Sequence, residues 1–134
     1  MQYKEFLGQV HQRARVDSLD KATAAVRATL TVLGQRLAGG EPDNLAAELP
    51  DEIGRYLQEA APRGQSFGFQ EFMERVSKEE GVDMPVAVHH ARAVISVLQE
   101  AVSAGEIDDV RAQLPDEFDP LFESGSEGTL GETA

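Results

Sequence analysis

The amino-acid sequence repeats itself after about 66 residues, and this repeat constrains the fold more than any other feature. Near the start, Val16 and Asp17 return as Val82 and Asp83. After a one-residue gap the register holds to the end of each copy. In that part, Leu30, Leu33, Gly40, Glu41 and Leu49 correspond to Ile95, Leu98, Gly105, Glu106 and Leu114. Two copies of one structural unit are therefore predicted.

Each copy contains a long segment whose hydrophobic residues lie on one helical face. The spacing i, i+4, i+7 and i+11 is typical of an α-helix. These positions are Val26, Leu30, Leu33 and Leu37 in the first copy, and Ala91, Ile95, Leu98 and Val102 in the second. Shorter segments with helical spacing open the copies, over residues 2–13 and 69–78. No segment alternates as a strand does, so the predicted class is all-α.

Glycine and proline mark the predicted ends of these helices. Gly39 and Gly40 in the first copy, and Gly105 in the second, are predicted to stop the central helices because glycine adopts left-handed backbone freely. Pro50 and Pro115 are predicted at the first position of a fourth helix, where their missing N–H is not needed. The prediction is a helical bundle made of two tandem repeats of about four helices each.

These boundaries predict a single domain over residues 1–122. It consists of a first repeat (1–60), a linker (61–67) with a proline and a glycine, and a second repeat (68–122). From Glu123 onward, glycine, serine, threonine and glutamate dominate. Residues 123–134 are therefore predicted to form a disordered tail.

A Gly-Glu-x-x-Asp-x-x-x-Gln-Leu-Pro motif spans residues 105–115, and an Arg-Ala motif with helical leucines precedes it in each copy. These motifs resemble bacterial domain-of-unknown-function family 2267, over nearly the whole chain apart from the tail. The likeness is carried by Phe72, Val76, Arg92, Ala93, Leu98 and residues 105–115, and more weakly by Arg27 and residues 40–50. Glu48 in the first repeat stands where the second has Gln113. The resemblance implies a helical fold and supplies no activity.

Charge and cysteine content exclude several classes of function. Acidic residues outnumber basic ones 24 to 12, for a formal charge of −12, so nucleic acid is not an expected partner. The chain has no cysteine, which excludes disulfides and thiolate chemistry and indicates a reducing cytoplasm. No secretion signal and no hydrophobic run of bilayer length is present, so no membrane association is expected.

Residues 64–68, Gly-Gln-Ser-Phe-Gly, match the Gly-x-Ser-x-Gly pattern of a hydrolase nucleophile. Asp83 and His89 or His90 follow in the order that a catalytic triad needs. That motif works on a strand-to-helix turn, and no strand is predicted here. We interpret the segment as a linker in which Ser66 or Gly68 caps the next helix, and we expect no catalytic residue.

His89 and His90 are adjacent on a predicted helix, so their side chains point about 100° apart and cannot easily hold one metal ion together. His11 belongs to a different helix. We expect His89 and His90 to lie on the surface beside the central helix.

The acidic cluster Glu106, Asp108 and Asp109 suggests a calcium loop, but Val110 and Arg111 stand where an EF-hand needs an oxygen ligand and a glycine. We assign these carboxylates to helix capping and dipole compensation. No metal and no cofactor is expected.

Three residues are the candidates for contact with a ligand or partner. Arg27 and Arg92 occupy the same place in both repeats, beside the hydrophobic stripe. A structural role there is favoured, and an anion site shared between the repeats is the alternative. Phe67 lies outside the repeated stripes, as do Tyr56 and Phe122, so each is either core or an exposed anchor for a partner.

The repeated residues are nearly all explained as core, cap or turn. The leading hypothesis is therefore a non-catalytic, cytoplasmic helical module that works through contacts with a partner protein or with itself. The alternative is a small-ligand sensor with a pocket at the seam between the repeats, a usual place for sites in helical bundles. An enzyme ranks third, since no nucleophile, base and orienting group converge.

Overall fold

A computed structural model describes residues 1–123 of the chain. Every regular element in this part is a helix, so the all-α prediction is confirmed. The elements are α1 (Tyr3–Ala14), α2 (Leu19–Arg36), α3 (Glu41–Ala46), α4 (Asp51–Gln58), α5 (Phe69–Glu80), α6 (Met84–Ala101), α7 (Ala104–Ala112), the 3-10 helix η1 (Asp116–Phe118) and α8 (Asp119–Phe122). Apart from Glu123, the predicted tail lies outside the described residues.

The two halves of the chain contain helices in the same order. The opening helices α1 and α5 have 12 residues each, and the central helices α2 and α6 have 18 each. The first half ends in one helix, α4, whereas the second ends in η1 and α8. Pro120 lies in the first turn of α8, and because it has no N–H it cannot continue a helix from η1. That the halves are copies of one fold stays a prediction.

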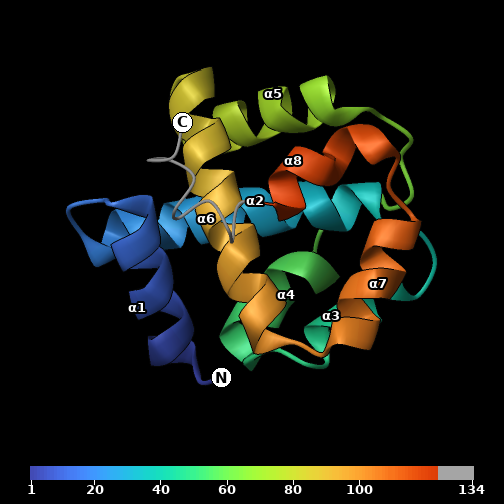
Figure 1. Ribbon diagram of the computed structural model, residues 1–134, viewed down its shortest axis with the longest axis horizontal. Helices are drawn as coiled ribbons and strands as arrows, with labels where there is room; N and C mark the ends of the chain where they lie inside the picture. The colour runs from blue at the N-terminus through green and yellow to red at the C-terminus, as the bar shows by residue number, and fades with distance from the viewer. Residues whose placement is uncertain (124–134) are drawn as a thin grey trace.

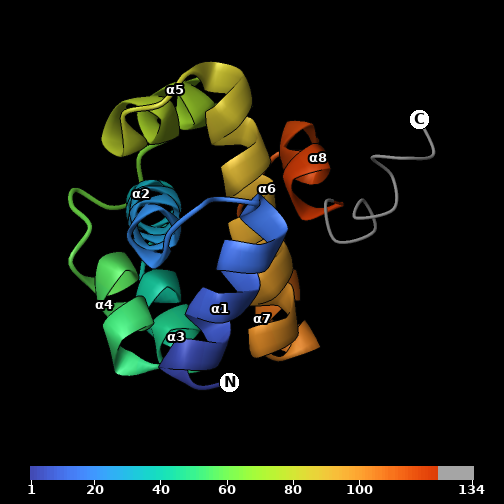
Figure 2. The same cartoon turned by 90° about the vertical axis from the view of Figure 1, so that its left-hand side faces the viewer.

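The central helices α2 and α6 pack against each other, and α1 and α5 each pack against both of them (Figure 1). Figure 2 looks along α2 and shows α5 and α1 on opposite sides of this pair. Outside it, α4 packs on α2, α8 packs on α6, and α3 contacts α7. The α3 helix also packs closely on α4, a contact with no equally extensive counterpart between α7 and η1 or α8.

The hydrophobic stripes predicted from spacing form the core. All eight stripe residues of α2, α6 and the positions just after them are at most 8% exposed. The opening helices contribute Phe6 and Val10 from α1, and Phe72 and Val76 from α5, all with 0% exposure. One cluster of buried hydrophobic side chains includes members of every helix, which places the core between the two halves.

Four predicted helix boundaries are wrong. Helix α2 ends at Arg36, before Gly39 and Gly40, and Gly40 is the N-cap of α3. Helix α6 ends at Ala101, and the hydroxyl of Ser103 caps α7 by accepting a hydrogen bond from the backbone N–H of Glu106. Gly105 therefore lies inside α7 and does not end α6. Pro50 and Pro115 are N-cap residues rather than first helical residues. An N-cap residue needs no intrahelical N–H bond, so proline is tolerated there for the same reason.

Two reciprocal contacts join the halves beside α3 and α7. The carboxylate of Glu48, just after α3, accepts hydrogen bonds from the backbone N–H of Ser103 at 2.7 Å and from its hydroxyl at 3.2 Å. The side chain of Gln113, just after α7, accepts from the backbone N–H of Ala38 at 2.7 Å and donates to its carbonyl at 3.4 Å. Each half therefore holds the segment that leads into the third helix of the other.

Candidate functional site

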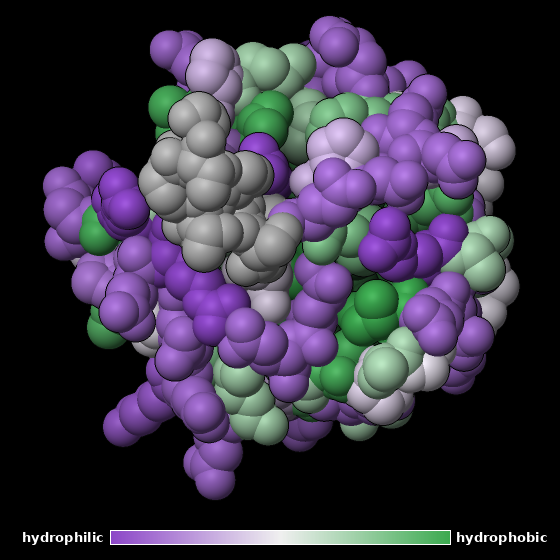
Figure 3. All heavy atoms as spheres, in the orientation of Figure 1, coloured by the Kyte–Doolittle hydropathy of each residue, from purple (hydrophilic) through white to green (hydrophobic). Residues whose placement is uncertain are grey.

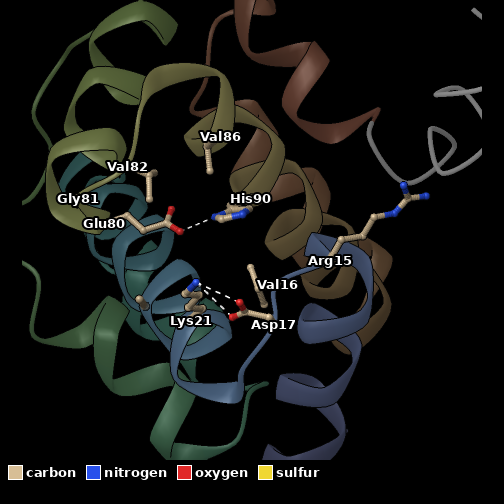
Figure 4. A pocket seen from close by; sticks show the side chains of 10 residues that line it. Arg15, Val16, Asp17, Lys21, Glu80, Gly81, Val82, Val86 and His90 are labelled. Atoms are coloured by element: carbon tan, nitrogen blue, oxygen red, sulfur yellow. Dashed lines mark hydrogen bonds and ion pairs between the residues drawn. The ribbon is translucent and has the colours of Figure 1, made fainter.

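A pocket of about 490 Å³ opens between the two halves (Figure 4). It lies at the N-terminal ends of α2 and α6, between the loop that joins α1 to α2 and the loop that joins α5 to α6. Its volume falls within the roughly 300–1,000 Å³ of small-molecule sites. The lining residues are Arg15, Val16, Asp17, Lys21 and Ala24 from the first half, and Glu80, Gly81, Val82, Val86 and His90 from the second. We call it the seam pocket.

Glu80 and His90 are the buried polar groups of the seam pocket. Their side chains are only 3% and 10% exposed. The Nδ1–H of His90 donates a hydrogen bond to Oε2 of Glu80, and Figure 4 shows the two side chains pointing toward each other from α5 and α6. The second carboxylate oxygen, Oε1 of Glu80, is buried and accepts no hydrogen bond. A buried acceptor without a donor is unfavourable, so this oxygen is an unsatisfied polar atom beside the seam pocket.

The Glu80–His90 pair belongs to one half only. In the alignment of the copies, Ala14 corresponds to Glu80 and Ala25 to His90. Both alanines are core residues, with 2% and 0% exposure. Small hydrophobic side chains therefore suffice for packing at this place in the first half. Burial of two polar side chains costs solvation that alanine does not lose, so packing alone does not explain the Glu80–His90 pair.

The mouth of the seam pocket carries exposed charges. Nζ of Lys21 lies 3.2 Å from the carboxylate of Asp17, and both side chains are largely in solvent, at 62% and 78% exposure. Arg15 has a left-handed backbone with φ of 56°, the one non-glycine residue with positive φ among residues 1–123. Its counterpart Gly81 has φ of 76° and no Cβ to clash. The side chain of Arg15 points away from Glu80 and His90 (Figure 4).

The rest of the wall is hydrophobic. Val16 and Val82 come from the two equivalent loops, and Val86 comes from the first turn of α6. Val86 is 42% exposed, one of the few large hydrophobic side chains of residues 1–123 that water reaches. The pocket thus combines one buried acceptor with a hydrophobic lining, which suits an amphipathic molecule.

The candidates chosen from the sequence lie elsewhere. Neither Arg27 nor Arg92 lines the seam pocket, since Arg27 is exposed on α2 and Arg92 is half-buried on α6. Phe67 is 8% exposed, and its ring lies 3.9 Å from the guanidinium carbon of Arg75. The side chain of Arg36 donates to the Phe67 carbonyl at 2.8 Å. Phe67 is therefore a packed residue and not an exposed anchor.

Tyr56 and Phe122 are not free surface anchors either. Tyr56 is half-buried and packs against the core, and Phe122 is 4% exposed beneath the guanidinium of Arg111, 4.9 Å from its ring centre. Of the predicted helix caps in the linker, Gly68 is the N-cap of α5. Gly68 has no side chain that could accept a hydrogen bond, so the carboxylate of Glu117 accepts one from the backbone N–H of Phe69, at 2.7 Å.

One of the two expectations about the histidines is wrong. His89 is exposed as predicted, but His90 is buried, because the turn between α5 and α6 brings Glu80 against it. Glu106 lies in the first turn of α7, as dipole compensation requires, and its side chain is buried against Glu41 of α3. The repeated Gly-Glu pair was a usable signal for Glu41 and Glu106. Nothing in the local sequence distinguishes Glu80 from its exposed neighbours.

Neither a metal cluster nor a membrane span is found in the described part of the chain. Among residues 1–123, no group of three or more histidine, aspartate and glutamate side chains is placed to hold a metal ion. None of the helices in the same part of the chain has the length and hydrophobicity needed to cross a membrane.

The fold and the seam pocket define the class: an all-helical domain with a cavity of small-molecule size between its halves. The sequence pattern of the family described as "Uncharacterized conserved protein (DUF2267)" matches residues 3–121. The chain belongs to this family, which confirms the resemblance seen in the sequence. A comparison with curated proteins finds no match.

Proposed function

We propose that this chain is a small-ligand-binding module whose binding site is the seam pocket. The observation that carries the proposal is the buried Oε1 of Glu80, which accepts no hydrogen bond and belongs to a pair that the first half replaces with alanines. Binding of a donor group would satisfy this oxygen and offset the unfavourable burial of the carboxylate.

The lining indicates the chemical class of the ligand. Val16, Val82 and Val86 offer a hydrophobic surface, and Glu80 offers a negatively charged acceptor beneath it. A matching molecule has a compact hydrophobic body and one amine or hydroxyl group. An acid of the same size is disfavoured, because its carboxylate would meet the Glu80 carboxylate in a poorly solvated site.

We propose binding rather than catalysis. Glu80 orients His90 as a carboxylate orients a catalytic histidine, yet the residues lining the seam pocket include no serine, threonine, cysteine or tyrosine to act as nucleophile. We place this binding in the cytoplasm, on the absence of cysteine from the sequence.

Contact with a partner protein, or self-association, remains our second proposal. Figure 3 shows hydrophilic side chains over most of one face, with a hydrophobic area over α7. In residues 1–123 the large hydrophobic side chains that are exposed are Met1, Leu19 and Val86, and Val86 belongs to the seam pocket. Scattered hydrophobic residues of this kind are normal on a monomer, so they favour no docking face.

Three probes that share one hydrophobic body test the proposed ligand class: benzylamine, benzyl alcohol and benzoate. Each is titrated into the ¹⁵N-labelled full chain and followed by amide NMR shifts. We expect benzylamine and benzyl alcohol to shift amides within residues 15–24 and 80–90, with Kd of about 1 mM, as suits so few atoms. Benzoate should leave these amides unchanged.

The matched control is Glu80→Ala combined with His90→Ala, which copies the first half of the chain. This variant should fold, lose the preference for the amine over the acid, and bind benzylamine at least about tenfold more weakly, because a charge-assisted hydrogen bond is gone. Equal binding of benzylamine to both proteins, or shifts confined to other regions, would contradict the proposal.

A further inference from the structure

A second pair of buried acidic side chains lies where α3 meets α7. Glu41 is 7% exposed and Glu106 is 9% exposed, and the alignment of the copies makes them counterparts. A side-chain hydrogen bond joins Glu41 and Glu106. The Oε2 atom of each is buried and has no hydrogen-bond partner. Glu41 lies in the first turn of α3 and Glu106 in the first turn of α7, so the contact between these two helices brings the two acids together.

Two carboxyl groups can share a hydrogen bond only if one of them carries a proton. Burial away from water, the hydrogen bond to Glu106 and the negative charge of Glu106, in that order, raise the pKa of Glu41 to about 8. Near neutral pH the pair therefore holds one proton, and its two carboxyl groups attract each other.

The charged groups on the surrounding helices do not neutralise the pair. Asp109 of α7 adds a third negative charge that raises the pKa of Glu41 further. The cations on and beside these helices have other partners: Arg63 of the linker pairs with Asp43 of α3, Arg111 of α7 with Asp119, and Arg55 of α4 with Glu59. The remaining acids, Asp108 of α7 and Asp51 and Glu52 of α4, are exposed. A second negative charge at the pair would thus be buried without a cation.

We propose that Glu41 and Glu106 form a proton-binding site that holds α3 against α7, and that loss of the shared proton weakens this contact between the halves. The site follows the C-terminal ends of α2 and α6, whereas the seam pocket lies at their N-terminal ends. It is therefore separate from the proposed ligand site, and either proposal can fail alone.

Because the pKa of Glu41 is raised, the stability of the folded chain should fall with increasing pH. An unfolded glutamate with a pKa of 4.5 has lost its proton well below neutral pH, while folded Glu41 keeps its proton to about pH 8. Between these two pH values the folded state binds more protons than the unfolded state. The contribution of Glu41 to the free energy of unfolding is therefore greatest below about pH 4.5 and falls as the pH rises to about 8.

The test compares wild type with Glu41→Gln in thermal melts from about pH 5 to about pH 9, in buffer with EDTA. Glutamine donates a hydrogen bond as the protonated acid does and never ionises. We expect Glu41→Gln to raise Tm by at least about 5 °C at the alkaline end and to change it little at the acidic end. Glu106→Gln removes the negative charge that helps to raise the pKa of Glu41, so it should weaken the pH dependence of Tm without abolishing it.

Two controls keep the outcome unambiguous. Asp108→Asn removes an exposed charge from the same helix and should leave the pH dependence as in wild type. A ¹³C-carboxyl NMR titration should show one glutamate with a midpoint well above 6 that is lost in Glu41→Gln. Glutamate midpoints that all stay near 4.5, or a Glu41→Gln variant destabilised at every pH, would overturn the proposal. Stabilisation of wild type by magnesium or calcium chloride, absent in Glu41→Gln, would also overturn it in favour of a cation site.

Discussion

Glu48 and Gln113 hold equivalent places in the two halves, and each hydrogen-bonds the backbone that leads into the third helix of the other half. Glu48 reaches Ser103 and Gln113 reaches Ala38, both at 2.7 Å. Different side chains thus make the same kind of contact, since a carboxylate and an amide oxygen both accept from a backbone N–H.

This exchange predicts the effect of removing either side chain. Glu48→Ala and Gln113→Ala should each lower the free energy of unfolding by about 1 kcal/mol, because each leaves a helix-leading N–H without its acceptor. Chemical denaturation followed by circular dichroism measures both. Glu52→Ala, an exposed acid on α4, is the control and should change stability by no more than about 0.5 kcal/mol. Silent Glu48 and Gln113 variants would mean that solvent serves these groups equally well.

Alanine substitution of two equivalent core leucines should leave a cavity at each position. Leu33 and Leu98 are counterparts on α2 and α6, and both are 0% exposed. Leu33→Ala and Leu98→Ala should each cost about 2 to 5 kcal/mol, because each removes buried methyl groups and leaves space that the packed helices cannot close. Urea denaturation decides the matter, and a loss below about 1 kcal/mol at either site would contradict the packing described.

Substitutions of Glu80 and His90 should have strongly non-additive effects on the free energy of unfolding. His90→Ala alone should cost about 3 to 5 kcal/mol, because it leaves the Glu80 carboxylate buried without its partner. Glu80→Ala with His90→Ala should lie within about 1 kcal/mol of wild type, as the first half packs alanines there. A double-mutant cycle from denaturant melts measures the coupling. His89→Ala is the control: it removes one hydrogen bond to the Ala14 carbonyl and should cost no more than about 1 kcal/mol. Additive effects of the Glu80 and His90 substitutions would contradict the coupling.

Glycine in place of Arg15, at the mouth of the seam pocket, should stabilise the chain. Its left-handed backbone strains any residue with a Cβ, so Arg15→Gly should raise the free energy of unfolding by about 0.5 to 1 kcal/mol. The counterpart change, Gly81→Ala, should lower it by a similar amount. Opposite signs in the two melts are the expected result, and a destabilised Arg15→Gly would show that the arginine stem contributes packing larger than the strain.

The sequence by itself determined the helices and their buried faces. The spacing of Val26, Leu30 and Leu33 fixes one side of α2, because side-chain direction within a helix depends only on the 3.6-residue period. The same local rule gave the stripe of α6 and the opening helices. Boundaries were less certain: Gly105 satisfies the rule for a helix stop, and the hydroxyl of Ser103 decides instead where α7 begins.

Only the tertiary structure decided which faces meet, and the candidate site depends on that. Glu80 pairs with His90 across a turn, and Glu41 meets Glu106 from the other half of the chain. Neither contact is encoded in the period of one helix, since it depends on how two helices pack. Arg27 and Arg92 were conspicuous because they repeat, yet packing leaves them outside the seam pocket. A repeat in sequence identifies equivalent positions, and long-range packing alone places them at a surface, in a core or beside a cavity.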